Sequence, residues 1–300
     1  MNVDNEFLKN LISKPKKISD LKVDRVSEIF NKAKDILRDE NLLLKIENKD
    51  PEEKVMVIGD VHGNLSSLKE LINYIEKNSP KYVVFLGDIV DRGSKQLECL
   101  IIILSIKILD PERYLILRGN HETEAMNRSY GFYTEFIQRY QDYDAYDKLL
   151  ELYELLPICA VINDAVVCLH GGVPEDFDIL NKIKGIKTKK LSEGIQNDVE
   201  DGIFQIMWND PKEGIGYFKD SFRGPGIKFF GKKAFEEFMN TYNFKYLIRA
   251  HECFPEGFRW FFDTRLLTIF SSENYRGMAS PNPATFAIVQ NKQVRSRILE

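Results

Sequence analysis

The sequence has no apolar run long enough to cross a membrane. The longest candidate spans residues 97–109, and Glu98, Ser105 and Lys107 interrupt it. Because a spanning helix needs about 20 predominantly apolar residues, we predict no membrane segment. The first ten residues are mixed and partly acidic, without the apolar centre of a secretory signal peptide, so we also expect no such leader.

Cysteine and net charge are scarce as well. The four cysteines form no close pair such as C-x-x-C: Cys99, Cys159, Cys168 and Cys253. Three of them lie in apolar runs, which is typical of small buried side chains in a reducing compartment. We therefore predict a cytoplasmic protein, with the nucleus as the alternative in a eukaryote. The net charge of −4 and the pI of about 5.8 disfavour a protein built mainly to bind nucleic acid.

The chain divides into a helical beginning and a longer alternating part. Of its 300 residues, 43% are hydrophobic, which is enough to bury a sizeable core. Within residues 1–50, apolar side chains recur at spacings of three and four, as in an amphipathic helix. We predict that residues 1–50 form a helical segment that packs on a main domain of residues 51–300, with a single domain overall.

The main domain alternates short apolar runs with helical patterns. Strands are predicted at 55–58, 82–86, 114–117, 158–162, 165–169, 245–248 and 266–270, and helices at 65–75 and 97–109. Strands that alternate with helices favour a parallel sheet, whereas the close pair at 158–162 and 165–169 suggests a hairpin in a second, mixed sheet. The predicted fold class is α/β: two packed mixed β-sheets, a β-sandwich, flanked by helices.

Five of the apolar runs end in polar motifs. These are GDVHG at 59–63, GDIVDRG at 87–93, GNHE at 119–122, HGG at 170–172 and RAHE at 249–252. All four histidines of the chain fall within them. Since ligands of α/β sheets bind beyond the carboxyl ends of the strands, we expect these motifs to meet at one site.

The side chains in these motifs are those of a metal site. Aspartate, histidine and asparagine suit divalent ions such as Mn, Fe and Zn, while the absence of cysteine from the motifs argues against a structural zinc. The flanking glycines allow sharp turns from strand to loop. Each motif is weak evidence alone, but five together indicate a shared metal centre.

In this order, the five motifs resemble those of the phosphoprotein phosphatases, the serine/threonine protein phosphatases related to calcineurin. Further matches are WNDP at 208–211, RGPG at 223–226 and FSSENY at 270–275. The similarity covers roughly residues 20–289. It implies the metallophosphoesterase fold, with residues 51–300 as the catalytic domain, and hydrolysis of phosphoserine and phosphothreonine by direct attack of a hydroxide held by two metals.

The resemblance also implies a role for each motif residue. Asp60 and His62 would hold the first metal, Asp88 would bridge both, and the second would be completed by Asn120, His170 and His251. The two divalent ions would be Mn, Fe or Zn. His121 would protonate the leaving group while Asp91 hydrogen-bonds it. The substrate phosphate would be bound by Arg92, Arg223, Asn120 and Tyr275. These roles suit the reaction, because an alkoxide leaving group needs a proton and the arginine fork pairs with phosphate.

Other activities fit part of the pattern. GDxHG, GDxxDRG and GNHE alone would also suit a dinucleoside polyphosphate hydrolase or another small phosphoesterase of the same fold. A non-catalytic protein that binds phosphoproteins is a further alternative, disfavoured because every ligand position is filled. Arg223 in the RGPG segment favours the protein phosphatase, whose partners would be phosphorylated proteins. Residues 271–277 read SSENYRG where eukaryotic members usually have SAPNYCG, so regulatory subunits and inhibitor sensitivity are not carried over.

Overall fold

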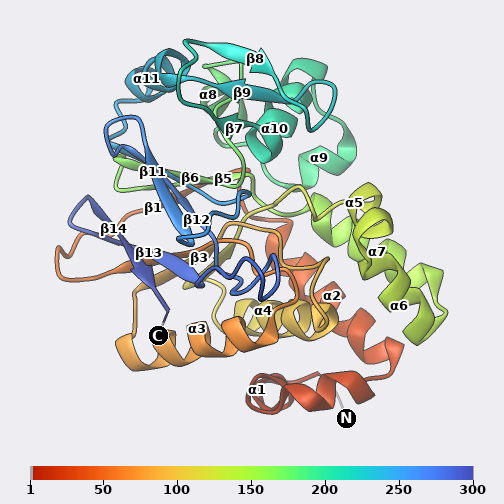
Figure 1. The fold of residues 1–300 in the computed structure, drawn as a ribbon. Coiled ribbons are helices and arrows are strands. Elements are labelled where there is room, and N and C mark those ends of the chain that lie inside the picture. Colours follow the sequence, from red (N-terminus) through yellow and green to blue (C-terminus); the bar gives the residue numbers. More distant parts are fainter. Residues whose placement is uncertain (1–2, 300) are drawn as a thin grey trace.

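Two sheets stacked face to face form the centre of the molecule in the computed structural model, which describes residues 3–299 (Figure 1). The five-stranded sheet has the order β14-β13-β2-β3-β4, and the six-stranded sheet has the order β1-β5-β6-β10-β12-β11. The strands of the first are β2 (Val55–Ile58), β3 (Tyr82–Phe85), β4 (Tyr114–Ile116), β13 (Thr285–Gln290) and β14 (Gln293–Ile298). Those of the second are β1 (Leu43–Ile46), β5 (Cys159–Ile162), β6 (Val166–Leu169), β10 (Tyr246–Arg249), β11 (Phe258–Phe261) and β12 (Leu266–Ile269).

Both sheets are mixed. β2, β3 and β4 run parallel, whereas β13 pairs antiparallel with β2 and with β14. In the other sheet β10 is parallel to β6 and β12, while β5 and β11 are antiparallel to their neighbours β6 and β12. The predicted fold class of two packed mixed sheets flanked by helices is therefore confirmed.

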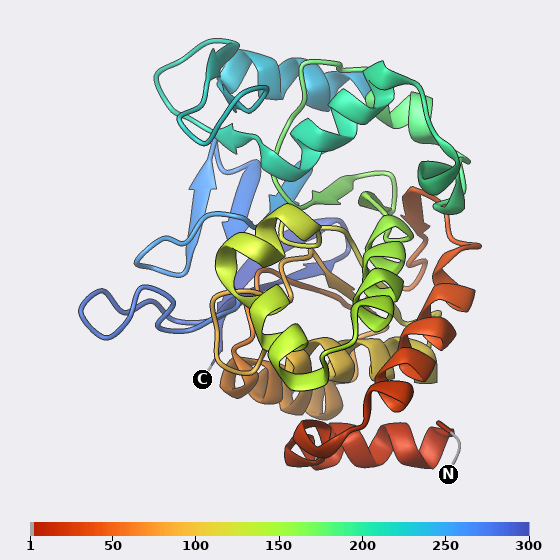
Figure 2. The same ribbon diagram turned by 90° about the vertical axis from the view of Figure 1, so that its right-hand side faces the viewer.

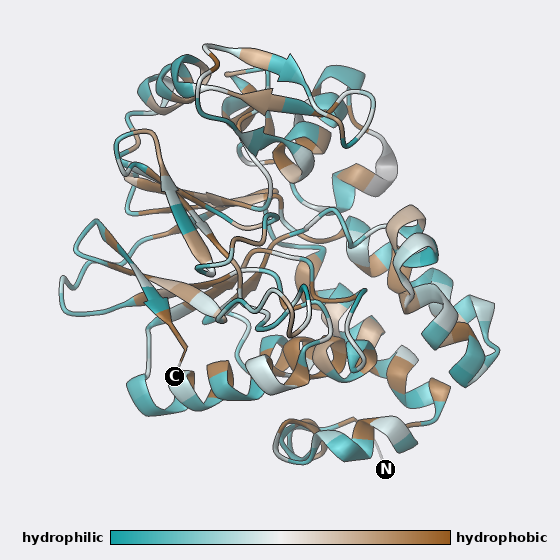
Figure 3. Ribbon diagram, in the orientation of Figure 1, coloured by the Kyte–Doolittle hydropathy of each residue, from teal (hydrophilic) through white to brown (hydrophobic). Residues whose placement is uncertain are grey.

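The core between the sheets follows from side-chain alternation along the strands. In β2, Val55 and Val57 face the second sheet, while Met56 and Ile58 face the helices outside. Both sets are fully buried because each sheet is covered on both faces, which explains why the strands read as continuous apolar runs. Figure 3 shows the hydrophobic residues concentrated on the strands and on the inward sides of the helices.

Helices cover the outer faces of both sheets (Figures 1 and 2). Beside the five-stranded sheet lie α1 (Asn5–Ser13), η1 (Pro15–Asp20), α2 (Val23–Leu37), α3 (Leu65–Asn78), α4 (Gln96–Leu109), α5 (Glu124–Tyr130), α6 (Phe132–Tyr140) and α7 (Tyr143–Glu154). The six-stranded sheet is covered by α8 (Ile179–Ile183), α9 (Lys189–Glu193), α10 (Asn197–Trp208) and α11 (Lys232–Thr241). A small third sheet joins β7 (Asp210–Pro211), β8 (Phe218–Asp220) and β9 (Lys228–Phe230) above them.

α4 is buried on nearly every side, between the sheet and the N-terminal helices α1 and α2. The two charged side chains that interrupt its apolar run both have partners: Glu98 accepts a hydrogen bond from Ser19 Oγ at 2.9 Å, and Lys107 is paired with Glu40. Among residues 3–299, no helix combines the length and apolar character that spanning a bilayer requires. All four cysteines are free and buried, as predicted.

The seven predicted strands and two predicted helices are present, with ends that differ by a few residues at most. Seven of the strands that the structure describes were not predicted: β1, β11, β13 and β14 of the two large sheets, and β7, β8 and β9 of the small sheet. β1 lies inside the segment expected to be helical and pairs in parallel with β5. The division of the chain at residue 50 stays a prediction.

Candidate active site

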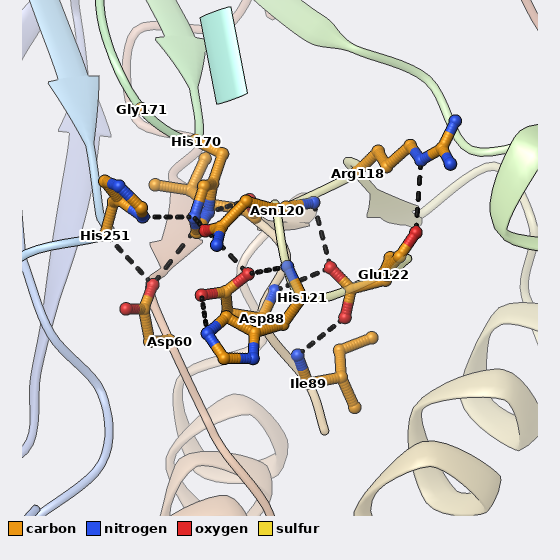
Figure 4. Close-up of polar contacts among 12 residues, drawn as sticks. Asp60, Asp88, Ile89, Arg118, Asn120, His121, Glu122, His170, Gly171 and His251 are labelled. Carbon is orange, nitrogen blue, oxygen red and sulfur yellow. Dashed lines mark hydrogen bonds and ion pairs between the residues drawn. The ribbon is translucent and has the colours of Figure 1, made fainter. Parts of the chain in front are cut away.

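The loops that follow six strands converge on one cavity of about 740 Å³. Its lining comes from the loops after β2, β3 and β4 of one sheet, after β10 and β12 of the other, and after β8 of the small sheet. Every predicted site residue except Asp91 and His170 lines this cavity, and these two lie buried directly behind it. The motifs that the sequence separates by up to 190 positions are thus brought together, as Figure 4 shows for their polar contacts.

One group of potential metal ligands lies around His170. Its Nδ1 lies 3.0 Å from the carbonyl oxygen of Leu86, which can only accept, so Nδ1 carries a proton and Nε2 is the ring atom that is able to bind a metal. That Nε2 lies 3.0 Å from Asn120 Oδ1, 3.1 Å from His251 Nδ1 and 3.4 Å from Asp88 Oδ1. Nitrogen and oxygen atoms of these types, gathered around one point, suit a divalent cation.

The electrostatics around His170 agree with that geometry. Although burial disfavours a protonated His170, the Asp88 and Asp60 carboxylates raise its pKa, so this position favours positive charge. Burial and the nearby Arg223 charge hold the pKa of His251 well below its ordinary value, which keeps this ring neutral. A neutral imidazole is the form that binds metals.

A second group is centred on His62. Its Nδ1 donates to the carbonyl oxygen of Val90 at 2.9 Å, and its Nε2 lies 3.5 Å from Asp88 Oδ2 and 3.8 Å from Asp60 Oδ2. Burial, and next His121, lower the pKa of His62 to about 3. Burial and the Asp88 carboxylate raise the pKa of Asp60 to about 7. Two buried carboxylates beside a neutral imidazole fit a divalent cation.

Asp88 belongs to both groups. Its oxygens lie within metal-binding reach of His62 and His121 on one side, and of His170 and His251 on the other. Although burial opposes ionisation of Asp88, the neighbouring histidines His170 and His121 lower its pKa well below the ordinary value. The residues present therefore fit metal ions at two adjacent positions that share one carboxylate.

His121 differs from the other three histidines in its hydrogen bond. Its Nδ1 is 2.8 Å from Asp91 Oδ2, and Asp91 also accepts from Asn127 Nδ2 at 3.0 Å and from the backbone N–H of Phe132 at 3.0 Å. Burial opposes protonation of His121, but the Asp88 and Asp91 carboxylates outweigh it and raise its pKa above the ordinary value. A protonated, oriented imidazole at the cavity wall can donate a proton.

Arg92 and Arg223 reach the cavity from segments far apart in the sequence, and different contacts hold their side chains. Arg223 Nε donates to Asp210 Oδ2 at 2.5 Å, and Asp210 is fixed in turn by Arg249 Nη2 at 2.8 Å. The Arg92 guanidinium lies over the Tyr130 ring, 3.7 Å from its centroid. Each therefore keeps N–H groups available for an anion in the cavity.

Tyr275 lies over the His62 ring, with the two centroids 5.0 Å apart and the planes at 20°. Its backbone N–H donates to Asn282 Oδ1 at 2.9 Å, and Asn282 also binds the carbonyl oxygen of Ser272 at 2.8 Å. Burial raises the pKa of the Tyr275 phenol, so it stays protonated and can donate a hydrogen bond into the cavity.

Several supporting residues were not recognised from the sequence. The fully buried carboxylate of Glu122 accepts from the backbone N–H groups of Asp88, Ile89 and Gly119, at 2.8, 2.9 and 2.9 Å. It thereby fixes the loop after β3 to the loop after β4. Glu122 lies within the GNHE motif, and this position beside predicted metal ligands could have indicated its role. Nothing in the sequence around Asn127 or Asn282 indicates that these residues support the site.

Five site residues have left-handed backbones although none is glycine. The φ angles are 46° at His62, 51° at Asp88, 68° at Asp91, 72° at Arg92 and 68° at His251. Such conformations cost free energy and persist where the surrounding structure holds them. Here these conformations turn the backbone sharply after each strand, so that the side chains point into the cavity.

The stacked mixed sheets and the two-position His/Asp site at the strand ends define a metallophosphoesterase. The sequence profile of the calcineurin-like phosphoesterases matches residues 53–255, and the chain belongs to this family. Family members use divalent metal ions, and the cluster around Asp88 is able to hold them.

Individual relatives narrow this class to the serine/threonine protein phosphatases. The serine/threonine-protein phosphatase 4 catalytic subunit of Candida glabrata is 34% identical over 246 residues, covering 82% of this chain and 77% of the relative. That of Kluyveromyces lactis is 32% identical over 255 residues, covering 84% and 78%. The chain is thus a phosphatase of the serine/threonine branch of its family.

A solved structure gives the same result for the fold. A Saccharomyces cerevisiae protein serine/threonine phosphatase with similarity to human phosphatase PP5 superposes with a TM-score of 0.84 at 25% identity, covering 99% of this chain and 96% of that one. A cold-active protein-tyrosine phosphatase of Shewanella, at 16% identity and a TM-score of 0.58, covers 89% and 84% and shares the fold alone.

Proposed function

We propose that this chain removes phosphate from phosphoserine and phosphothreonine side chains of proteins in one step, without a covalent phosphoenzyme. One observation carries the proposal: the metal-ligand cluster, the His121–Asp91 pair and two arginines line or adjoin the same cavity. The reaction requires a nucleophile, a proton donor and groups that bind the phosphate, and the metal-ligand cluster, the His121–Asp91 pair and the arginines suit these roles in turn.

We assign the metal positions as follows. Asp60, His62 and Asp88 would hold one ion, and Asp88, Asn120, His170 and His251 would hold the second; Mn, Fe and Zn all suit these donors. When bound, such a pair of ions neutralises phosphate oxygens and lowers the pKa of a water molecule so that it can attack phosphorus. The close approach of metal-binding nitrogen and oxygen atoms around His170 and His62 supports this assignment.

The chain's own side chains carry out the remaining tasks. Arg92 and Arg223 bind and orient the phosphate oxygens, with Asn120 and Tyr275 beside them. His121 gives the proton on its Nε2 to the departing serine or threonine oxygen, and Asp91 stabilises the protonated ring through Nδ1. His121 also lies within ligand distance of the first metal position, but its raised pKa and its bond to Asp91 favour the role of proton donor.

A substrate comparison tests the proposal. We expect a phosphoserine peptide to be hydrolysed with a much higher kcat/KM than diadenosine tetraphosphate. Arg223→Lys keeps the charge but loses the planar fork, so it should lower both turnover and affinity for the peptide; the exposed Arg295 provides a control, Arg295→Lys, that should change neither. A preference for the dinucleotide would make the chain a dinucleoside polyphosphate hydrolase, and phosphopeptide binding without turnover would make it a non-catalytic binding protein.

We further propose phosphorylated proteins as its partners and the cytoplasm as its location, with the nucleus as the alternative in a eukaryote. The four free, buried cysteines support a reducing compartment. No regulatory subunit is assigned, and the expectation of no nucleic-acid partner stays a prediction. Fractionation of cells followed by immunodetection of the chain tests the location.

A further inference from the structure

Two of the large apolar side chains that remain exposed line the catalytic cavity. Among residues 3–299, the well-exposed ones are Tyr130, Tyr143, Tyr217, Phe222, Met278 and Ile298. Phe222 and Tyr130 line the cavity, and Met278 follows the lining residue Arg276 by two positions. Phe222 is 88% exposed, so almost its whole ring is available to a bound molecule. An exposed aromatic ring at the wall of a cavity offers apolar contact area to a molecule bound there.

The position of Phe222 is fixed by its own loop, between β8 and β9. Ser221 N donates to the carbonyl oxygen of Ile227 at 2.9 Å, and Arg223 N donates to Ser221 Oγ at 3.2 Å. The Phe222 ring also contacts the Phe229 ring, with centroids 5.4 Å apart. Since its chain neighbour Arg223 is anchored on Asp210, the backbone at Phe222 is held next to the proposed phosphate site.

Arg276 is the cavity arginine without a partner. Arg223 is paired with Asp210, Arg259 with Glu256 at 2.8 Å, and Arg92 lies on Tyr130. Arg276 is exposed, and within the part of the chain that the structure describes it makes no hydrogen bond or ion pair. Its charge is therefore available to an anionic group of a molecule in the cavity.

The loop that carries Arg276 is ordered by internal bonds. Asn274 N donates to the carbonyl oxygen of Asn282 at 2.9 Å, and Gly277 N donates to that of Asn274 at 2.8 Å. The preceding residue, Tyr275, lies over His62. Figure 2 shows this β12–β13 loop and the β8–β9 loop extending from the same side of the molecule, with the β10–β11 loop between them.

We propose that these two loops select the protein segments that the enzyme dephosphorylates. Phe222 contacts an apolar side chain, and Arg276 pairs with an acidic side chain, each within a few residues of the phosphorylated one. An extended segment advances about 3.3–3.6 Å per residue, so residues near a phosphate held by Arg92 and Arg223 pass both loops. The inference rests on the proposed function and adds its substrate class: phosphorylated segments with apolar and acidic neighbours.

Three matched phosphothreonine peptides test this selection. In the first, the two residues on each side of the phosphothreonine are alanine; in the others they are phenylalanine or glutamate. The kcat/KM for each peptide is divided by the value for p-nitrophenyl phosphate measured with the same variant. For the parent we expect the phenylalanine peptide to exceed the alanine peptide about tenfold and the glutamate peptide to exceed it about threefold.

Each preference should depend on one residue. Phe222→Ser should abolish the preference for phenylalanine only, and Arg276→Gln the preference for glutamate only. Added salt should weaken the second preference and spare the first, because it screens an exposed ion pair. Tyr143→Ser and Arg295→Gln are controls, since they remove an exposed aromatic and an exposed arginine elsewhere, and both should keep the two preferences.

Equal normalised rates for the three peptides, or preferences that survive the two variants, would overturn this selection while leaving the protein phosphatase intact. Loss of both preferences in each variant would also overturn it, because the two loops would then not act separately. If no phosphopeptide is hydrolysed while p-nitrophenyl phosphate is, the proposed function itself fails. The two failures are thus distinguishable.

Discussion

The floor of the cavity and the layer behind it satisfy their polar atoms in opposite ways. On the floor, Nε2 of His170 lies 3.0 Å from Asn120 Oδ1 and 3.1 Å from His251 Nδ1, so that atoms able to bind a metal gather around shared points. Behind it, the Glu122 carboxylate meets three backbone N–H groups and Asp91 meets three donors. The back layer satisfies its polar atoms within the chain, whereas the floor gathers side chains that suit cations. Substitutions in the two layers should therefore affect stability and catalysis to different degrees.

The largest effect should come from the floor. Asp88→Asn removes the shared carboxylate, so we expect the metal content to fall and the turnover of p-nitrophenyl phosphate to drop by about 1,000-fold, since several kcal/mol of charge stabilisation is lost. Elemental analysis and steady-state kinetics measure the two. Asp144→Asn, at an exposed aspartate, is the control. Two retained ions with near-parental turnover would show that the floor does not need Asp88.

His121 lies where the two layers meet, and its variant should separate proton donation from metal binding. His121→Asn should keep the metals but lose about 100-fold or more in kcat on a phosphoserine peptide, because the serine oxygen needs a proton to leave. The loss on p-nitrophenyl phosphate should be far smaller, since nitrophenolate leaves without one. Equal losses on both substrates, with metals intact, would remove His121 from this role.

A substitution in the back layer should mainly change the stability of the fold. Glu122→Gln leaves an amide facing backbone N–H groups that a carboxylate had bound, so we expect the free energy of unfolding to fall by about 2–3 kcal/mol. Denaturant unfolding of the variant measures this. Glu124→Gln, which alters a surface pair with Arg128, should leave that free energy nearly unchanged. If the two variants were equally stable, the back layer would not hold the site together.

The smallest effect should appear when the ions are removed. Burial raises the pKa of Asp60 to about 7, so the folded chain holds this proton more tightly than the unfolded chain does. Chelator-treated protein should therefore gain stability as the pH falls from about 7 towards about 4 and lose it again as the pH rises. Asp60→Asn should flatten this dependence and raise Tm at neutral pH by about 2–4 °C. A lower Tm would mean that the floor is stable without cations.

The sequence predicted the residues of the cavity floor better than those of the layer behind it, and the reason is physical. Metal ligands must be Asp, His or Asn, so their types and places after strands are visible in the chain, and the structure brings Asp60, Asp88 and His170 together as expected. Asn127 donates a hydrogen bond of 3.0 Å to Asp91, which lies thirty-six residues earlier, and no local sequence pattern indicates this contact. The left-handed backbones at His62 and Arg92 are equally invisible, because tertiary contacts impose them.

The same contrast holds for the fold. Strands such as β2 and β3, buried on both faces, read as apolar runs and were predicted. β1 is four residues long with a charged Lys45 in it, and it exists because β5 offers a parallel edge 116 positions away. β14 is largely exposed, so its sequence has little apolar signal, and its pairing with β13 around Asn291 and Lys292 is what makes it a strand.

The order of strands in the five-stranded sheet has a consequence for synthesis of the chain. β2, the first of its strands to leave the ribosome, has β13 as one neighbour, and β13 is made some 230 residues later. Until then β2 has an open edge of apolar residues, a surface prone to pair with other chains. The nascent enzyme is thus exposed to aggregation for most of its translation, and we expect its yield in cells to depend on chaperones that shield this edge.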